Sequence, residues 1–299
     1  MSAGHHDHAP PNYNRAFAIG VGLNVTYIAV EVVFGIVAGS LALLADAGHN
    51  LSDVLGLLLS WGAHHFSRTA TTTRRTYGLR RTSILAALGN ALLLLIAVGA
   101  IVWESIRRLS NPEPAAGLTI VTVAAVGVLI NGVTAWLFMA GRKGDLNIRS
   151  AFLHMAADAG VSLGVVLAGL AIYTTGLLWI DPVMSLLVAA VIAIGTWGLL
   201  RDSTALAVDA VPKGIDPVAV QHYLEQLPGV RGVHHLHIWP ISTTETALTA
   251  HLVKPDAQID DDLLCEIDRE LHDQFEICHA TIQFERESSR CADVAPPTR

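Results

Sequence analysis

Long apolar stretches, separated by short polar breaks, fill the first two thirds of the sequence. Each stretch is close to the roughly 20 residues that a helix needs to cross the hydrocarbon core of a membrane. The pattern predicts six membrane-spanning helices, at Phe17–Val37, Leu41–Phe66, Ser83–Leu109, Leu118–Ala140, Ile148–Thr174 and Pro182–Leu200. We therefore expect an all-α six-helix transmembrane bundle over residues 15–208. A flexible, His-bearing segment over residues 1–14, which is no signal peptide, is expected to precede it.

The pattern changes after Asp209 to that of a small soluble domain. Two runs have helical periodicity, and three short runs are rich in residues that favour strands. In chain order these are the helix Asp216–Leu227, the strands Val230–Trp239 and Thr246–Val253, the helix Asp260–Phe275 and the strand Ala280–Phe284. This αββαβ order predicts a ferredoxin-like α+β domain over residues 209–287, with helices on one face of a three-stranded sheet. Residues 288–299 are expected to be disordered.

Composition and charge favour a membrane protein whose two termini face the cytoplasm. The chain is 52% hydrophobic and only 15% charged, whereas a typical soluble domain has about 25% charged residues. Residues 1–201 have 12 Lys or Arg against 9 Asp or Glu, and residues 202–299 have 7 against 17. Most basic residues of the first part lie on one predicted side, at Arg15, Arg68, Arg74, Arg75, Arg80, Arg81, Arg142, Lys143, Arg149 and Arg201. Such residues favour the cytoplasmic side, so we place both termini there.

Ionisable residues recur with the same spacing inside two of the apolar stretches. His49 and Asp53 are four residues apart, and so are His154 and Asp158. Four residues are about one helical turn, so each pair projects from one helix face. Ionisable side chains at membrane depth are costly and usually mark an ion pathway or a proton relay. Two imidazoles and two carboxylates also suit tetrahedral zinc, whereas simple polar packing between helices explains two matched pairs poorly. We interpret the quartet as a metal site shared by two helices.

Two further polar residues, Asp46 and Asn50, lie on or near the same helix face as His49. We expect them to orient the metal ligands or to line a water-filled path, because polar neighbours commonly do so at metal sites. A membrane-embedded zinc hydrolase is an alternative interpretation of the quartet. Such an enzyme keeps one coordination position open for water, however, and four protein ligands would fill the shell.

Histidines also gather in the predicted soluble domain, at His234, His235, His237, His251 and His279, together with Glu285. A strand period of two places His235 and His237 on one face and His234 on the other. The clustering of zinc-type ligands predicts a second metal site in this domain. The chain has three cysteines, Cys265, Cys278 and Cys291. An odd number of cysteines does not indicate a disulfide framework. His5, His6 and His8 form either a disordered segment or a weak metal acceptor.

Several of these segments resemble signatures of the cation diffusion facilitator family. Ser40–Asp53 is similar to its second-helix signature and Leu146–Asp158 to its fifth-helix signature. Further family blocks are matched by Arg75–Gly78, Asn111–Pro114, Asp181–Ser185 and Val233–Trp239. The resemblance covers about Arg15 to Glu285. It implies six helices, a metallochaperone-like cytoplasmic domain, a homodimer and efflux of divalent metal in exchange for protons. The His/Asp quartet resembles that of the zinc-exporting bacterial branch, which implies a bacterial inner membrane.

The resemblance also assigns roles to single residues. His234, His251 and Glu285 fall on ligand positions of the family's cytoplasmic metal site, and His279 fits a ligand position of the animal zinc transporters. Gln283 stands where some bacterial members have His. Arg81 and Asp209 match a charged pair that joins two chains near the membrane, although two solvated charges are the alternative.

Some relatives bind a second metal in the loop after the second helix. The matching positions here are Thr72, Arg75 and Leu79, none of which is a ligand for a cation. We therefore expect this loop site to be absent.

The sequence thus predicts a transporter rather than an enzyme. We expect proton-coupled efflux of zinc, with cadmium, cobalt and nickel as further candidate substrates, by alternating access at the quartet. Zinc is then the transported substrate and the ligand of the cytoplasmic site, and the partners are protons, the lipid bilayer and a second copy of the chain, with no nucleic acid. The alternatives are the hydrolase, a manganese- or iron-type exporter of the same family, and a passive metal channel.

Overall fold

The computed structural model describes residues 13–66, 72–139, 146–255 and 261–286. They fall into two compact units. The first contains the residues up to Leu58 together with Asn90–Trp197, and the second contains Leu59–Gly89 together with the residues from Gly198 onward. The predicted flexible segment, apart from its last two residues, and the predicted disordered tail lie outside the described residues.

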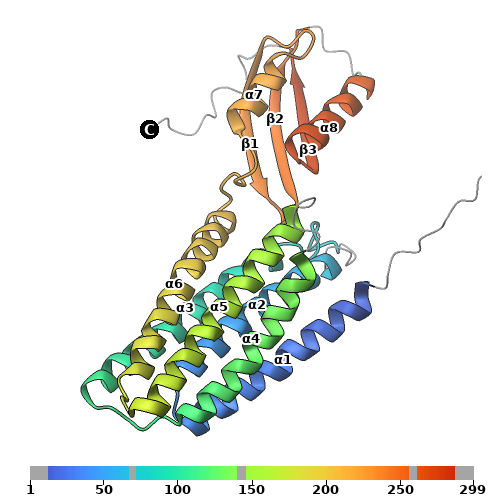
Figure 1. Cartoon of the computed structure of the whole chain (residues 1–299). Coiled ribbons are helices and arrows are strands. Elements are labelled where there is room, and N and C mark those ends of the chain that lie inside the picture. Colours follow the sequence, from blue (N-terminus) through green and yellow to red (C-terminus); the bar gives the residue numbers. More distant parts are fainter. Residues whose placement is uncertain (1–12, 67–71, 140–145, 256–260, 287–299) are drawn as a thin grey trace, which may run out of the picture. The chain divides into compact units, whose positions relative to one another are not determined.

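Long helices precede a small sheet in the described part of the chain (Figure 1). The helices are α1 (Tyr13–Ala38), α2 (Leu41–Phe66), α3 (Thr82–Ser110), α4 (Gly117–Met139), α5 (Leu146–Thr175) and α6 (Ile180–Ala207). Among the described residues, four segments are long and apolar enough to cross a membrane, namely Thr82–Ser110, Gly117–Leu137, Phe152–Thr175 and Ile180–Ala207. Their outward faces carry large apolar side chains such as Ile96, Trp103, Leu129 and Ile194. Apolar surface on this scale suits lipid better than water.

The core of the first unit is apolar, and its helices approach closely. Buried side chains of Leu43, Ile120, Val165 and Val188 form one cluster. Helix α4 packs along α5, where a Cβ atom added at Gly117 would stand 2.7 Å from a backbone oxygen of α5. Small residues at such crossings allow the backbones of membrane helices to come into contact. The packing therefore fixes α5, which carries His154 and Asp158.

The beginning of α2 is held by a carboxylate from the beginning of α6. The chain turns between α1 and α2 at Gly39, whose φ of 64° is unfavourable for other residues. Asp181, buried at 2% exposure, accepts hydrogen bonds from Ser40 Oγ (2.6 Å), the Leu41 amide (2.8 Å) and the Ala42 amide (3.3 Å). The first amides of a helix have no partner within the helix, and a negative charge is favourable there. Asp181 therefore fixes the start of the helix that carries His49 and Asp53.

The second unit contains a three-stranded sheet with two helices. After the end of α6, its elements are α7 (Pro217–Glu225), β1 (Gly232–Pro240), β2 (Thr246–Val253), α8 (Asp261–Phe275) and β3 (His279–Glu285), in the predicted αββαβ order. The strand order is β1-β2-β3, with β1 antiparallel and β3 parallel to β2. The parallel pair needs a crossover connection, which α8 provides. Leu224, Leu248, Leu252, Ile267 and Leu271 form the core between sheet and helices. This packing positions the edge residues of the sheet.

We predict that Asp181→Ala destabilises the protein although it lies outside the metal quartet. The substitution leaves the Ser40 hydroxyl and two helix amides buried without an acceptor, which costs about 1–3 kcal/mol in the free energy of unfolding. A denaturing-detergent titration of the purified protein measures this loss. Asp181→Asn keeps one acceptor oxygen and should lose less. Equal stability of Asp181→Ala and the unmodified protein would show that the contact does not hold α2.

Candidate metal centres

The quartet predicted from the sequence comes together in the first unit. His49 Nε2 lies 3.0 Å from Asp158 Oδ1 and 3.9 Å from Asp53 Oδ2. His154 Nε2 lies 3.4 Å from Asp53 Oδ2 and 3.6 Å from Asp158 Oδ2. Each imidazole from one helix thus faces the carboxylate of the other helix as well as that of its own. The two rings meet edge to face, with their centroids 6.3 Å apart.

The ligand atoms of this quartet converge, and the burial of the four side chains differs. One ligand atom each from His49, Asp53 and Asp158 lies within 4.8 Å of the others. The Asp158 side chain is 4% exposed and that of His49 18%, whereas that of His154 is 45% exposed. Two imidazoles and two carboxylates are a good donor set for zinc, and the two negative charges neutralise a divalent ion. The side chains present therefore fit zinc.

Asp46 and Asn50 do not bond the quartet directly. Asp46 Oδ2 accepts a hydrogen bond from Ser162 Oγ (2.9 Å), and Asn50 Nδ2 donates one to Glu31 Oε2 (2.9 Å). All four of these side chains are buried. The two residues thus link α2 to α1 and α5 beside the quartet. Glu31 was not predicted as a site residue, because its neighbours on α2 are remote in the sequence.

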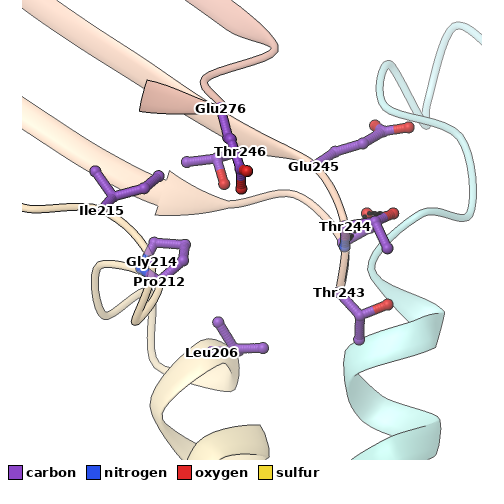
Figure 2. A pocket seen from close by; sticks show the side chains of 10 residues that line it. Leu206, Pro212, Gly214, Ile215, Thr243, Thr244, Glu245, Thr246 and Glu276 are labelled. Carbon is purple, nitrogen blue, oxygen red and sulfur yellow. Dashed lines mark hydrogen bonds between the residues drawn. The ribbon is translucent and has the colours of Figure 1, made fainter. Parts of the chain in front are cut away.

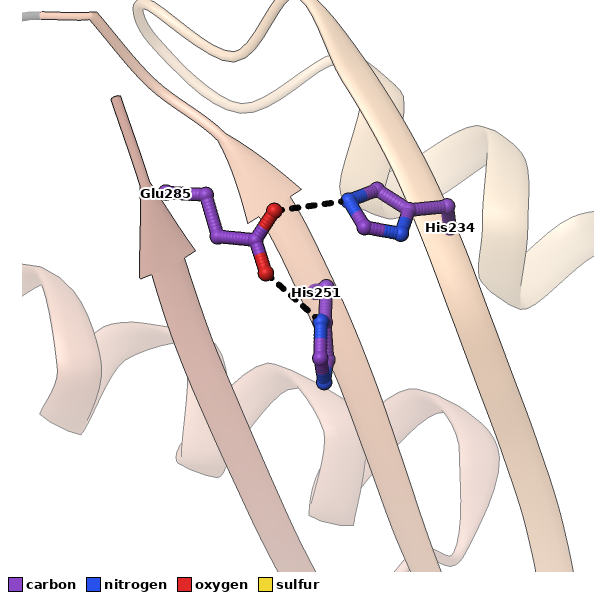
Figure 3. A group of neighbouring side chains, drawn as sticks. All are labelled: His234, His251 and Glu285. Atoms are coloured by element: carbon purple, nitrogen blue, oxygen red, sulfur yellow. Dashed lines mark hydrogen bonds and ion pairs between the residues drawn. The ribbon is translucent and has the colours of Figure 1, made fainter. Parts of the chain in front are cut away.

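A second group of metal-type ligands lies on the sheet of the second unit. His234 Nε2 lies 3.0 Å from Glu285 Oε2, and His251 Nδ1 lies 2.8 Å from Glu285 Oε1 (Figure 3). His234 and His251 face each other across β1 and β2, and their ring centroids are 5.2 Å apart. Gln283 Nε2 donates to Glu285 Oε1 at 2.9 Å and so supports this carboxylate. Two imidazoles and a carboxylate again fit zinc.

Hydrogen bonding controls the charge of Glu285. Its burial would by itself raise the pKa of the carboxyl, but hydrogen bonds from His251 and His234 outweigh this and lower the pKa below its ordinary value. A carboxylate that accepts such bonds favours its charged form. Glu285 therefore keeps its negative charge to a lower pH than an ordinary glutamate does.

The strand period of two separated His235 from His234, but the structure brings the two side chains together. The register of β1 against β2 shifts between His234 and His237, and His235 has a φ of 49°. A β-bulge inserts one extra residue and breaks the alternation of faces. The His235 ring consequently lies 5.1 Å from those of both His234 and His251, between centroids. His235 thus joins His234, His251 and Glu285 in one cluster, which crosses all three strands near one end of the sheet. We call these four residues the sheet-edge site.

His279 is not part of the sheet-edge site in this structure. Its Nε2 lies 3.0 Å from a guanidinium nitrogen of Arg80, and Glu245 accepts a 2.5 Å hydrogen bond from the same nitrogen. The sequence grouped His279 with the other histidines because it could not show this pairing with the loop before α3. Arg81, the next residue, pairs with Asp209 within one chain, and both side chains are about half exposed.

Some residues discussed in the sequence analysis belong to neither group of ligands or are not described by the structure. Thr72 and Arg75 form an isolated β-bridge in the loop between α2 and α3. His5, His6, His8 and Cys291 lie outside the described residues.

A hollow of about 130 Å³ in the second unit is lined by Leu206, Pro212, Ile215, Thr244, Thr246 and Glu276, among others (Figure 2). It belongs to neither group of ligands.

Comparison with known proteins identifies the family of this chain. The cation efflux transmembrane domain matches residues 17–206, and the cytoplasmic domain of cation efflux proteins matches residues 212–287. The zinc transporter ZitB of Escherichia coli is 37% identical over 281 residues, which are 93% of this chain and 90% of that protein. The metal cation efflux system protein CzcD of Cupriavidus metallidurans is 34% identical over 297 residues, 99% and 94% of the two chains.

A third relative has a name that specifies exchange of ions. The cadmium, cobalt and zinc/H(+)-K(+) antiporter of Bacillus velezensis is 33% identical over 285 residues, 94% of this chain and 91% of that protein. Both family domains and three nearly full-length relatives therefore agree with the resemblance seen in the helix signatures. The chain belongs to the cation efflux family.

Proposed function

We propose that this protein exports zinc from the cytoplasm in exchange for protons, at His49, Asp53, His154 and Asp158. The observation that carries the proposal is the convergence of the four side chains from two helices, with each imidazole within 4 Å of both carboxylates. Relatives named as a zinc transporter and as a proton-linked antiporter of cadmium, cobalt and zinc support it. Cadmium, cobalt and nickel are further candidate substrates, because His/Asp sites follow the general order of metal affinity.

Competition for the same atoms explains the exchange. Zinc requires neutral imidazoles and ionised carboxylates, so its arrival displaces protons from the quartet. When the quartet faces the cytoplasm it takes up zinc and releases protons. When it faces the other side, protons from outside displace zinc. An inward proton gradient thus drives export without ATP, and the chain cycles between two states that each open to one side.

The membrane arrangement is part of the proposal. We infer six crossings by α1 to α6 over residues 15–208, with both termini in the cytoplasm of a bacterium and the protein in its inner membrane. The apolar character of the helices and the placement of Lys and Arg support this. Residues 209–287 form a ferredoxin-like cytoplasmic domain, and two copies of the chain form a homodimer, as the family implies.

The sheet-edge site serves regulation rather than passage of zinc. Residues 202–299 have 7 basic against 17 acidic residues, so two such domains repel each other. Zinc held by His234, His251 and Glu285, with His235 adjacent, reduces this charge and stiffens the sheet edge. His279 is bonded to Arg80 instead, so we place it outside this site.

Removal of either quartet carboxylate should abolish zinc efflux. In Asp53→Ala or Asp158→Ala the site loses one ligand and one negative charge, so zinc would keep an unneutralised charge in an apolar environment. Zinc flux in proteoliposomes measures the effect, and size-exclusion chromatography checks that the protein remains folded. Glu113→Ala, which removes an exposed carboxylate, is the matched control. Normal zinc flux by either quartet variant would rule out the assignment.

The imidazoles should set the choice of metal. His49→Asp replaces a nitrogen ligand by a harder oxygen ligand and adds negative charge, so manganese and cadmium should gain relative to zinc. Competitive flux of the metals in vesicles reports the order of preference. An unchanged order would mean that the quartet does not determine selectivity.

Loss of the sheet-edge site should weaken activation while transport at saturating zinc persists. His251→Ala removes an imidazole that contacts Glu285, so zinc-dependent compaction of the domain should decrease. Fluorophores on the domain report compaction, and vesicle flux reports transport. His272→Ala, on an exposed position of α8, is the control. Complete loss of flux in a folded His251→Ala dimer would show that this site is an obligatory step.

A further inference from the structure

A second pair of carboxyl groups is buried beside the metal quartet. Glu31 on α1 has no exposed surface, and Asp46 on α2 is 1% exposed. Asn50 Nδ2 donates to Glu31 Oε2 at 2.9 Å, and Ser162 Oγ donates to Asp46 Oδ2 at 2.9 Å. The two carboxyl groups also interact with each other. One acidic pair is thus enclosed by α1, α2 and α5.

The bonding around this pair is incomplete. Neither Glu31 Oε1 nor the Tyr27 hydroxyl has a hydrogen-bond partner among the described residues, although the two groups interact. Tyr27 is 5% exposed and is packed so closely against α4 that a Cβ atom at Gly127 would stand 2.1 Å from its hydroxyl. A buried polar atom without a partner is unusual and needs an explanation. A hydrogen atom on Glu31 Oε1 would let this oxygen donate to a neighbouring acceptor such as Asp46.

The charges that face the pair do not allow both carboxyls to ionise. Besides Tyr27 on α1, the titratable groups that act on it are His49 on α2 and Asp158 on α5. Lys and Arg are absent from α2, from α4 and from residues 24–38 of α1, and the single one on α5, Arg149, is near its beginning. Two adjacent carboxylates in an apolar environment repel each other and lose hydration, so one of them keeps a proton.

We propose that Glu31 and Asp46 together hold one proton, and that this pair is a proton-binding site separate from the metal quartet. The proton sits on a Glu31 oxygen and forms an O–H···O hydrogen bond to Asp46. On release only this O–H bond breaks, and the carboxylate keeps the electron pair. The inference rests on the proposed exchange of zinc for protons and names residues that carry part of the exchanged charge.

The position of the pair couples it to zinc. Asp46 precedes His49 by about one turn of α2 and interacts with it electrostatically. The double positive charge of zinc at the quartet favours ionisation of the pair and so releases its proton. By linkage, a proton on the pair weakens zinc binding by the same factor. The fixed contacts through Asn50 and Ser162 keep the pair in place while this happens.

Proton counting with Glu31→Gln tests this site. The amide in this variant keeps the shape of the side chain and can donate to Asp46, but it has no proton to release. Zn²⁺ is titrated into the purified full-length protein in weakly buffered detergent solution, and the protons released per bound zinc are recorded. The variant should bind the same amount of zinc and release about one proton fewer, because the amide does not ionise. Glu113→Gln, with the same change at an exposed carboxyl, should match the unmodified protein.

A second measurement does not depend on how the variant folds. In the unmodified protein, infrared difference spectra on addition of Zn²⁺ should show loss of a protonated-carboxyl C=O band. Equal proton release by Glu31→Gln and the unmodified protein, or no such band before zinc, would overturn the inference. A proton count that changes when K⁺ is replaced by choline would also overturn it, because a metal cation would then occupy the pair.

Failure of the proposed function has a different signature. An unmodified protein whose zinc flux in vesicles does not respond to a pH gradient would refute zinc–proton exchange. The infrared band of the zinc-free protein would still decide whether Glu31 is protonated.

Discussion

Negative charge buried in an apolar bundle is the constraint on which this structure depends. The Asp158 side chain is 4% exposed and that of Asp53 is 29% exposed, and each carboxylate lies within 4 Å of both imidazoles. Such carboxylates are tolerated only when a cation neutralises them, and the cation is either a proton on the imidazoles or a divalent metal. The same atoms therefore cannot hold both at full occupancy. Exchange of metal for protons is a direct consequence of this competition.

The rest of the first unit keeps the two halves of the quartet in place. Asp181 fixes the start of α2 through three hydrogen bonds, and the close contact of α4 with α5 at Gly117 positions α5. Between them, Asn50 and Ser162 connect the quartet's helices to a buried acidic pair. The quartet and the acidic pair therefore share α2, which carries His49, Asp53 and Asp46. A change at one of them acts electrostatically on the other.

Local patterns predicted the elements well, because hydrophobic periodicity and turn residues act within a few positions. The four-residue spacing of His49 and Asp53 and of His154 and Asp158 also predicted that these side chains share helix faces, and the structure brings the two pairs together. Contacts between remote segments were not predictable in this way. The bulge at His235 depends on how β1 pairs with β2, and the bond of His279 to Arg80 depends on a loop that is about 200 positions away in the sequence. Glu31 stands out in the sequence as a polar residue of a predicted span, suited to packing or to a pathway. Its pairing with Asn50 and Asp46 was not predictable, because these residues approach it only when α1 packs on α2.

The central claim is that zinc occupies the quartet, and its direct test is a structure of the zinc-loaded protein with anomalous scattering measured at the zinc edge. The account predicts an anomalous peak bonded to His49, Asp53, His154 and Asp158. It also predicts that this peak disappears in Asp158→Ala, while a peak at the sheet-edge site remains. A zinc-loaded protein with no peak at the quartet, and with zinc bound only at the sheet edge, would contradict it.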